Sequence, residues 1–242
     1  MNPGEDKRSK LATGVYEALK TVVGSENISD GIDGRSKADV IVKPGSAEEV
    51  SSIISIGRKN GTKVYSCNNP SWNTDGTPAA GGILVDLSRI NFAPKIDTVS
   101  QSVRVGAGTR WNKLIEAVEK EGFTLGSYPF DRSSSVGSWT VTNGVGFGAY
   151  KYGSSKDNVL SLRVVTEDAA VIETGYDKIG SYMSGYNLNQ LFSASEGTLG
   201  IVVEATLKIH PAGINRLAAY EFPSLDAIQT AIKKVVQHPS VK

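Results

Sequence analysis

Apolar positions recur with helical spacing in three stretches of the first half of the chain. They share one helix face over residues 9–23, between Ser46 and Gly61, and between Trp111 and Gly122. The second stretch opens with Ser46-Ala47-Glu48-Glu49, which has the spacing of a capping box, because the Ser46 hydroxyl can accept from the Glu49 amide. The sequence therefore predicts three helices, and the second begins at Ser46.

Shorter apolar or alternating runs predict strands, and most of them lie in the second half of the chain. Helices segregated among many strands indicate α+β layers rather than regular βαβ winding. A further short helix is expected around Leu188 to Phe192. The predicted strands cover residues 64–66, 83–87, 102–105, 159–165, 171–174, 200–209 and 219–222, and the last of them is followed by a helix from Pro223-Ser224.

Composition excludes several classes of function. The 242 residues carry a formal net charge of +1, which gives no field to attract nucleic acid. No apolar run approaches the length of a membrane span, and the N-terminus is polar, so a cytoplasmic protein is expected. With one cysteine, Cys67, and two histidines, His210 and His238, we expect no internal disulfide and no zinc site.

Three segments rich in glycine and hydroxyl side chains are candidates for ligand binding. They are Ser66–Trp72, Ser133–Gly148 and Ser193–Val202. Small residues let a ligand approach the backbone, and exposed amides can bind anionic groups. Each segment has a second interpretation, as a turn that needs glycine only for its geometry. A Rossmann nicotinamide site is not expected, because no Gly-x-Gly-x-x-Gly fingerprint follows a strand and opens a helix.

Taken together, these segments resemble the FAD-binding domain of the vanillyl-alcohol oxidase and p-cresol methylhydroxylase family, called the PCMH type. The resemblance runs from about Ala38 to Pro211, through Ile41–Val50, Leu84–Asn91 and Val105–Gly108. The motif from Ser195 to Ile201 matches the family's "sEGtLGi" pattern residue for residue. Within the family, Ser134–Trp139 is most similar to alkyl-dihydroxyacetonephosphate synthases and to D-lactate and glycolate dehydrogenases.

This resemblance implies a fold of two α+β subdomains that hold an elongated FAD between them. Backbone amides of the loop Ser66–Trp72 would hold the diphosphate, and the later segments would wrap the diphosphate, flavin ring, ribityl chain and adenosine. The residues implied are Ser66, Cys67, Asn68, Asn69, Ser71 and Trp72, then Pro129, Ser134, Ser135, Val136 and Gly137, then Val141, Thr142, Asn143 and Gly144, and finally Glu196, Gly197, Gly200, Ile201 and Val202.

The sequence departs from the family pattern in the diphosphate loop. Asn68-Asn69-Pro70-Ser71-Trp72 stands where the family has a glycine-rich turn, and Pro70 has no amide to donate. A second departure is Gly137-Ser138 in place of a glycine pair. No histidine lies in or near the loops that carry covalent flavin links, so the resemblance implies non-covalent FAD.

Residues 1–37 are interpreted as an N-terminal helix and lead-in, and 38–212 as the FAD-binding domain, with subdomains of about 38–108 and 109–212. Residues 213–242 resemble only the first strand and helix of the family's cap domain. The expected function is that of a flavin-dependent oxidoreductase acting on a 2-hydroxy acid or similar alcohol, with a partner subunit or a homo-oligomer. The alternative is a flavin-free structural partner. No residue is assigned as catalytic, and neither the substrate nor the electron acceptor is identified.

Overall fold

The computed structural model describes residues 13–31, 38–67, 81–178, 185–214, 218–239 and 241. The chain divides into two compact units, Met1–His210 and Pro211–Lys242, and each is described by itself.

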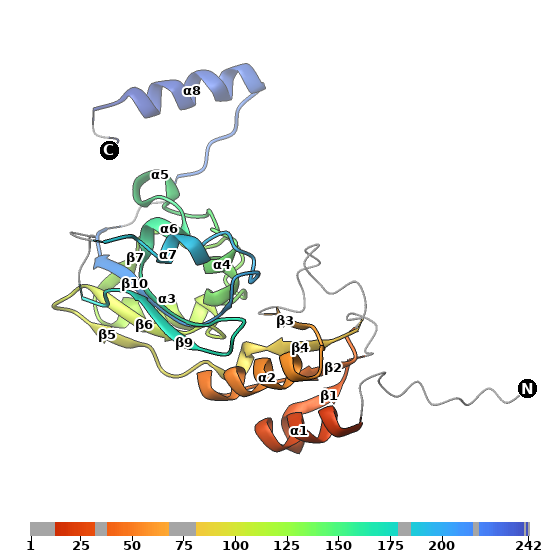
Figure 1. Cartoon of the computed structure of the whole chain (residues 1–242). Helices are drawn as coiled ribbons and strands as arrows, with labels where there is room; N and C mark the ends of the chain where they lie inside the picture. Colours follow the sequence, from red (N-terminus) through yellow and green to blue (C-terminus); the bar gives the residue numbers. More distant parts are fainter. Residues whose placement is uncertain are drawn as a thin grey trace, which may run out of the picture. The chain divides into compact units, whose positions relative to one another are not determined.

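The first sheet has four strands in the order β1-β2-β4-β3. Strand β1 (Ile28–Asp30) runs antiparallel to β2 (Val40–Val42), whereas β3 (Val64–Cys67) and β4 (Ile83–Asp86) continue the sheet in parallel. Helices α1 (Thr13–Val23) and α2 (Ala47–Lys59) lie beside this sheet in Figure 1. Short 3-10 turns, η1 (Ser25–Asn27) and η2 (Leu87–Arg89), complete the connections.

Helix α2 begins where the capping pattern predicts. The Ser46 hydroxyl accepts from the Glu49 amide at 3.1 Å, and the Glu49 carboxylate accepts from the Gly45 amide at 2.8 Å. Its buried face includes Val50 and Ile53, which pack into the core of the first sheet. The local pattern therefore predicts both the start and the buried face of this helix.

The second sheet has six strands, in the order β5-β6-β10-β8-β9 with β7 also paired to β10. Its long strand β10 pairs antiparallel with both β6 and β8. The last strand of the first sheet ends at Asp86, and the first strand of the second sheet begins at Lys95. The strands are β5 (Lys95–Asp97), β6 (Ser102–Gly106), β7 (Phe123–Leu125), β8 (Val159–Val165), β9 (Val171–Gly175) and β10 (Ile201–Pro211).

Side chains alternate along each strand, so one face of the second sheet is apolar. The other face carries polar side chains except at one end, where Val165, Ile201 and Val203 pack into the core of the first sheet. The apolar face packs against helix α3 and against α4, whose Trp111 and Trp139 rings meet edge to face at 4.8 Å between centroids. The polar face carries Arg104, Arg163 and Glu204. The helices of this region are α3 (Trp111–Lys120), α4 (Val136–Val141), α5 (Ala149–Tyr152), α6 (Ser155–Asn158) and α7 (Asn189–Phe192).

These two sheets with their helices confirm the α+β fold with two subdomains that the sequence predicts. Among the described residues, the helices are all too short or too polar to cross a lipid bilayer.

The second unit contains helix α8 (Leu225–Gln237), capped by the Ser224 hydroxyl, which accepts from the Ala227 amide at 3.2 Å. The helix confirms the sequence pattern, but the strand expected over residues 219–222 is wrong, because this described stretch is extended coil. A strand needs a partner strand to satisfy its backbone groups. Taken by itself, this unit buries no residue of α8.

Candidate functional site

A pocket of about 260 Å³ lies where helix α2 and the start of β3 meet the end of β8 and the loop before β10. Three of the residues expected to bind the cofactor, Gly197, Gly200 and Ile201, line it. The remaining wall residues are Ile54, Arg58, Thr62, Val64, Val165, Glu167 and Thr198. The pocket therefore lies between the two subdomains, as the family resemblance implies for the cofactor.

The loop that enters β10 has an unusual backbone. Ala194, Glu196 and Gly197 have φ angles of 64°, 51° and 80°, in the left-handed region. Such a conformation costs an ordinary side chain about 1–2 kcal/mol, so the loop must be held by its contacts. The Thr198 hydroxyl donates to the Ser195 carbonyl at 2.6 Å, and the Ser195 hydroxyl donates to the Phe192 carbonyl at 2.8 Å.

Glycine is needed at two positions of this loop because neighbouring atoms come close. A Cβ atom on Gly197 would lie 2.9 Å from Ser66 Oγ, and one on Gly200 would lie 2.8 Å from Val164 Cγ1. Ser66 is at the carboxyl end of β3, so the first candidate segment meets the loop. Cys67 ends the same strand. Asn68, Asn69, Ser71 and Trp72 lie outside the described residues.

The segment from Val141 to Gly144 also reaches the loop. The Glu196 amide donates to the Val141 carbonyl at 3.0 Å. Asn143, with a φ angle of 49°, accepts at its side-chain oxygen from the Ser154 hydroxyl at 2.9 Å. Gly144 has no room for a side chain, because a Cβ atom there would overlap the Trp139 indole. The Thr142 side chain is exposed.

Within the second candidate segment, Ser134 to Gly137 are more deeply buried and do not line the pocket. The Ser134 hydroxyl donates to the Asp131 carbonyl at 2.7 Å, and the Ser135 hydroxyl caps α4 by accepting from the Ser138 amide at 3.3 Å. Val136 is fully buried, and the Gly137 amide donates to the Ala107 carbonyl at 2.8 Å.

Pro129 and Val202 are buried as well, and Val202 belongs to the core of the second sheet. The structure thus brings Ser66, Val141, Glu196 and Gly197 together, and it uses the side chains of residues 134–136 inside the second subdomain.

Sequence reasoning missed Arg58, which brings a positive charge to a pocket that Glu167 also lines with a negative one. The pKa of the nearby Asp168 is lowered, chiefly by the Thr166 hydroxyl and then by the Ala170 amide, with a contribution from the charge of Arg58. Nothing in the local sequence distinguishes Arg58 from another exposed residue at the end of a helix, because its role depends on contacts with residues more than 100 positions away.

Curated relatives match most of the chain. A glycolate oxidase subunit GlcD of Bacillus subtilis is 31% identical over 92% of this chain and 50% of its own length. A D-lactate dehydrogenase of Anaerostipes hadrus is 30% identical over 80% of this chain and 42% of its own. An uncharacterised FAD-linked oxidoreductase of Mycobacterium tuberculosis is 33% identical over the same shares. The chain spans half or less of the length of these relatives.

Solved structures show the same fold. An alkyldihydroxyacetonephosphate synthase superposes with a TM-score of 0.74 at 23% identity, over 86% of this chain and 42% of that one. A 4-ethylphenol oxidase from Gulosibacter chungangensis superposes with a TM-score of 0.70 at 20% identity, over 82% of this chain and 42% of that one. At these identities the likeness concerns the fold.

A family model described as the FAD-binding domain matches residues 38–175, which is more than half of the chain. The chain therefore belongs to the FAD-binding domain family, with the PCMH-type fold that its sequence predicts.

Proposed function

We propose that this chain is the FAD-binding part of an oxidoreductase that acts on a 2-hydroxy acid or a similar alcohol. One observation carries the proposal: the Gly197–Ile201 loop, whose glycines leave no space for side chains, lines a pocket between the two subdomains beside Ser66. A nucleotide cofactor needs this combination of close backbone approach, apolar wall and positive charge.

The pocket fits the adenosine end of FAD. Ile54, Val64 and Ile201 offer an apolar wall for a planar ring, and the Arg58 guanidinium can stack on that ring or pair with a phosphate. The exposed Thr198 hydroxyl donates its hydrogen to the Ser195 carbonyl, so its oxygen is left to accept from a ribose hydroxyl.

The diphosphate would lie at the carboxyl end of β3. In sheets of parallel strands, ligands bind beyond the carboxyl ends of the strands. Ser66 and Cys67 lie at the carboxyl end of β3, which runs parallel to β4. We assign the residues that follow, Asn68 to Trp72, to the same task. The segments from Pro129 to Gly137 and from Val141 to Gly144 would contribute backbone groups toward the flavin ring.

When bound, the flavin supplies a two-electron acceptor for a hydride from the substrate carbon. The residues of this chain bind and orient the cofactor. The loop from Ala194 to Gly197 already holds its left-handed backbone conformation without a ligand, so its amides are in place when the cofactor binds. Binding then costs less conformational entropy.

We further propose that FAD is held without a covalent bond. The chain has two histidines, and neither lines the pocket: His210 stacks on Tyr152 at 4.5 Å between ring centroids, and His238 follows α8. Acid precipitation of the FAD-loaded protein tests this, because it should release all flavin into the supernatant. Yellow colour that stays in the pellet would contradict non-covalent binding.

The substrate class rests on the relatives, which include a D-lactate dehydrogenase and a glycolate oxidase subunit. Since one of these relatives is named as a subunit, we propose that a partner subunit contributes to the substrate site and that the face of α8 with Leu225, Ile232 and Val235 contacts it. These side chains are 77%, 55% and 57% exposed.

The function is tested by reduction of a redox dye. The tagged chain is isolated with its partners from its own cells and given D-lactate, glycolate or, as a control, succinate. We expect a second polypeptide in the preparation and dye reduction with the hydroxy acids alone. Full dye reduction by the chain without a second polypeptide would contradict the partner proposal. Inactivity with every hydroxy acid would contradict the substrate class.

A further inference from the structure

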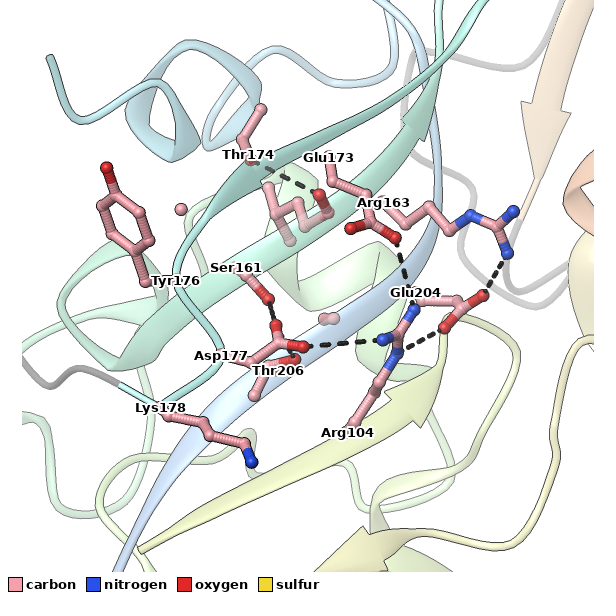
Figure 2. Close-up of a pocket in the computed structure, with 13 residues that line it drawn as sticks. Arg104, Ser161, Arg163, Glu173, Thr174, Tyr176, Asp177, Lys178, Glu204 and Thr206 are labelled. Carbon is pink, nitrogen blue, oxygen red and sulfur yellow. Dashed lines mark hydrogen bonds and ion pairs between the residues drawn. The ribbon is translucent and has the colours of Figure 1, made fainter. Parts of the chain in front are cut away.

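The polar face of the second sheet carries a chain of alternating charges, shown in Figure 2 around a cavity of about 350 Å³. Glu204 of β10 accepts from Arg104 Nε at 2.7 Å and from Arg163 Nη1 at 2.9 Å. Arg104 also lies 3.5 Å from Asp177 and 3.6 Å from Glu173. Because both arginines are paired with carboxylates, we assign the cluster a role in holding the strands together.

Arg163 extends this network to the other subdomain. Its second terminal nitrogen, Nη2, donates to Glu48 at 2.9 Å, and Glu48 lies in the first turn of α2. One guanidinium thus joins a helix of the first sheet to two strands of the second. The side chains of Glu204 and Arg163 are 14% and 27% exposed, so solvent screens their pair less than it screens an exposed pair.

A second contact fixes the same two elements. The Ser51 hydroxyl of α2 donates to the Ala169 carbonyl, in the turn between β8 and β9, at 2.6 Å. Glu48 and Ser51 are three positions apart and therefore lie next to each other on one helix face. Helix α2 therefore lies along the end of the β8–β9 hairpin and is held there at two points.

The elements held in this way are the walls of the cofactor pocket. Beyond Ser51, helix α2 places Ile54 and Arg58 in the pocket, and two residues beyond Arg163, strand β8 places Val165 in it. The spacing between α2 and β8 therefore determines the width of the pocket.

We propose that Arg163 is a positioning residue for the cofactor: by joining Glu48 of α2 to Glu204 of β10, it sets the width of the pocket and so the affinity for FAD. We call these three residues the α2–β8 clasp. The inference rests on the proposed function, because it takes the pocket to be the adenosine site. Arginine is required here, since a planar guanidinium reaches two carboxylates at once and a lysine ammonium does not hold the same geometry.

The test is the dissociation constant for FAD, measured by flavin titration of the full chain at low and at high salt. Glu48→Gln removes the charge of one partner, and Arg163→Lys keeps the charge but loses the bridge. The matched control is Glu116→Gln, which removes an exposed pair with Lys120 at 2.8 Å on α3, away from the pocket.

We expect Glu48→Gln to weaken FAD binding by about 2- to 5-fold at low salt, the change that an ion pair of about 0.5–1 kcal/mol provides. The difference should shrink at high salt, where charges are screened. Adding Glu48→Gln to Arg163→Lys should cost little more than Arg163→Lys alone, because both act on one bridge. Glu116→Gln should leave FAD affinity unchanged at either salt concentration.

Two outcomes would overturn the proposed role of the clasp, and they can be told apart. A wild-type chain that takes up no FAD overturns the proposed function and, with it, the role of the clasp. A wild-type chain that binds FAD, with Glu48→Gln binding equally well at low salt or the two substitutions acting additively, overturns the clasp alone. Thermal unfolding of each FAD-free variant ensures that the titrations compare folded protein.

Discussion

Replacing Gly197 with alanine tests the role of the loop before β10 most sharply. Gly197 has a φ angle of 80°, and a Cβ atom there would lie 2.9 Å from Ser66 Oγ. The left-handed backbone costs alanine about 1 kcal/mol, and the close approach to a hydroxyl that can rotate adds up to about 1 kcal/mol. We therefore expect Gly197→Ala to lower the free energy of unfolding by about 1–2 kcal/mol.

The matched control is Gly122→Ala. Gly122 has a φ angle of 77° and follows helix α3, and no atom lies within 4 Å of a Cβ atom built there. It carries the same backbone cost without the contact, so the free energy of unfolding should fall by about 1 kcal/mol. FAD affinity should not change, because Gly122 does not line the pocket.

The two variants should differ in their dissociation constants for FAD. The added methyl group of Gly197→Ala occupies the junction of Ser66 and the pocket, so we expect the dissociation constant to rise at least about 10-fold, which corresponds to about 1.4 kcal/mol. Chemical unfolding of the FAD-free proteins measures the change in the free energy of unfolding independently of FAD binding. Equal FAD affinity of Gly197→Ala and Gly122→Ala would refute the assignment of this loop to the cofactor.

Three further substitutions test other parts of the structure. Arg58→Ala should weaken FAD binding by about 2- to 5-fold, since Arg58 is exposed and an exposed stacking contact is worth about 0.5–1 kcal/mol; unchanged titration curves would contradict this. Gly144→Ala should lower the free energy of unfolding by about 3 kcal/mol or more, because its Cβ atom would overlap the buried Trp139 indole; a loss below about 1 kcal/mol would count against that packing. Burial lowers the pKa of His210 below its ordinary value of 6.5, so the unfolded chain takes up a proton at a higher pH than the folded chain does. The free energy of unfolding is therefore highest above about pH 6.5 and falls as the pH drops from there toward the folded-state pKa. His210→Phe keeps the ring beside Tyr152, and its free energy of unfolding should fall less between about pH 7.5 and 5.5 than that of the wild type; parallel curves would contradict it.

Much of the fold follows from local patterns. Helix α2 could be predicted because its capping box and its apolar face agree, and β8 and β10 because their apolar runs are long. The three-residue strands β1, β5 and β7 are too short to show a period. Helix α4 was not predicted as a helix, because its sequence, VGSWTV, is rich in β-branched residues and contains glycine.

The site was predictable only in part. The loop before β10 could be found because glycine and hydroxyl residues precede a long strand, and its geometry confirms that the loop and Ser66 lie together. Arg58 could not be found, because a helix position does not reveal which distant strand it faces. The clasp could be sought in the sequence, because Arg163 and Glu204 are charged residues within mostly apolar strands, and Arg104 lies on the adjacent strand β6.

Uptake of FAD by the purified chain tests the central claim most directly. The FAD-free protein is titrated with FAD, freed of excess cofactor and examined for flavin absorbance near about 450 nm. The account predicts a yellow protein with one FAD per chain, released in full by acid. A folded, colourless protein that takes up no FAD would contradict it and would favour the flavin-free structural partner instead.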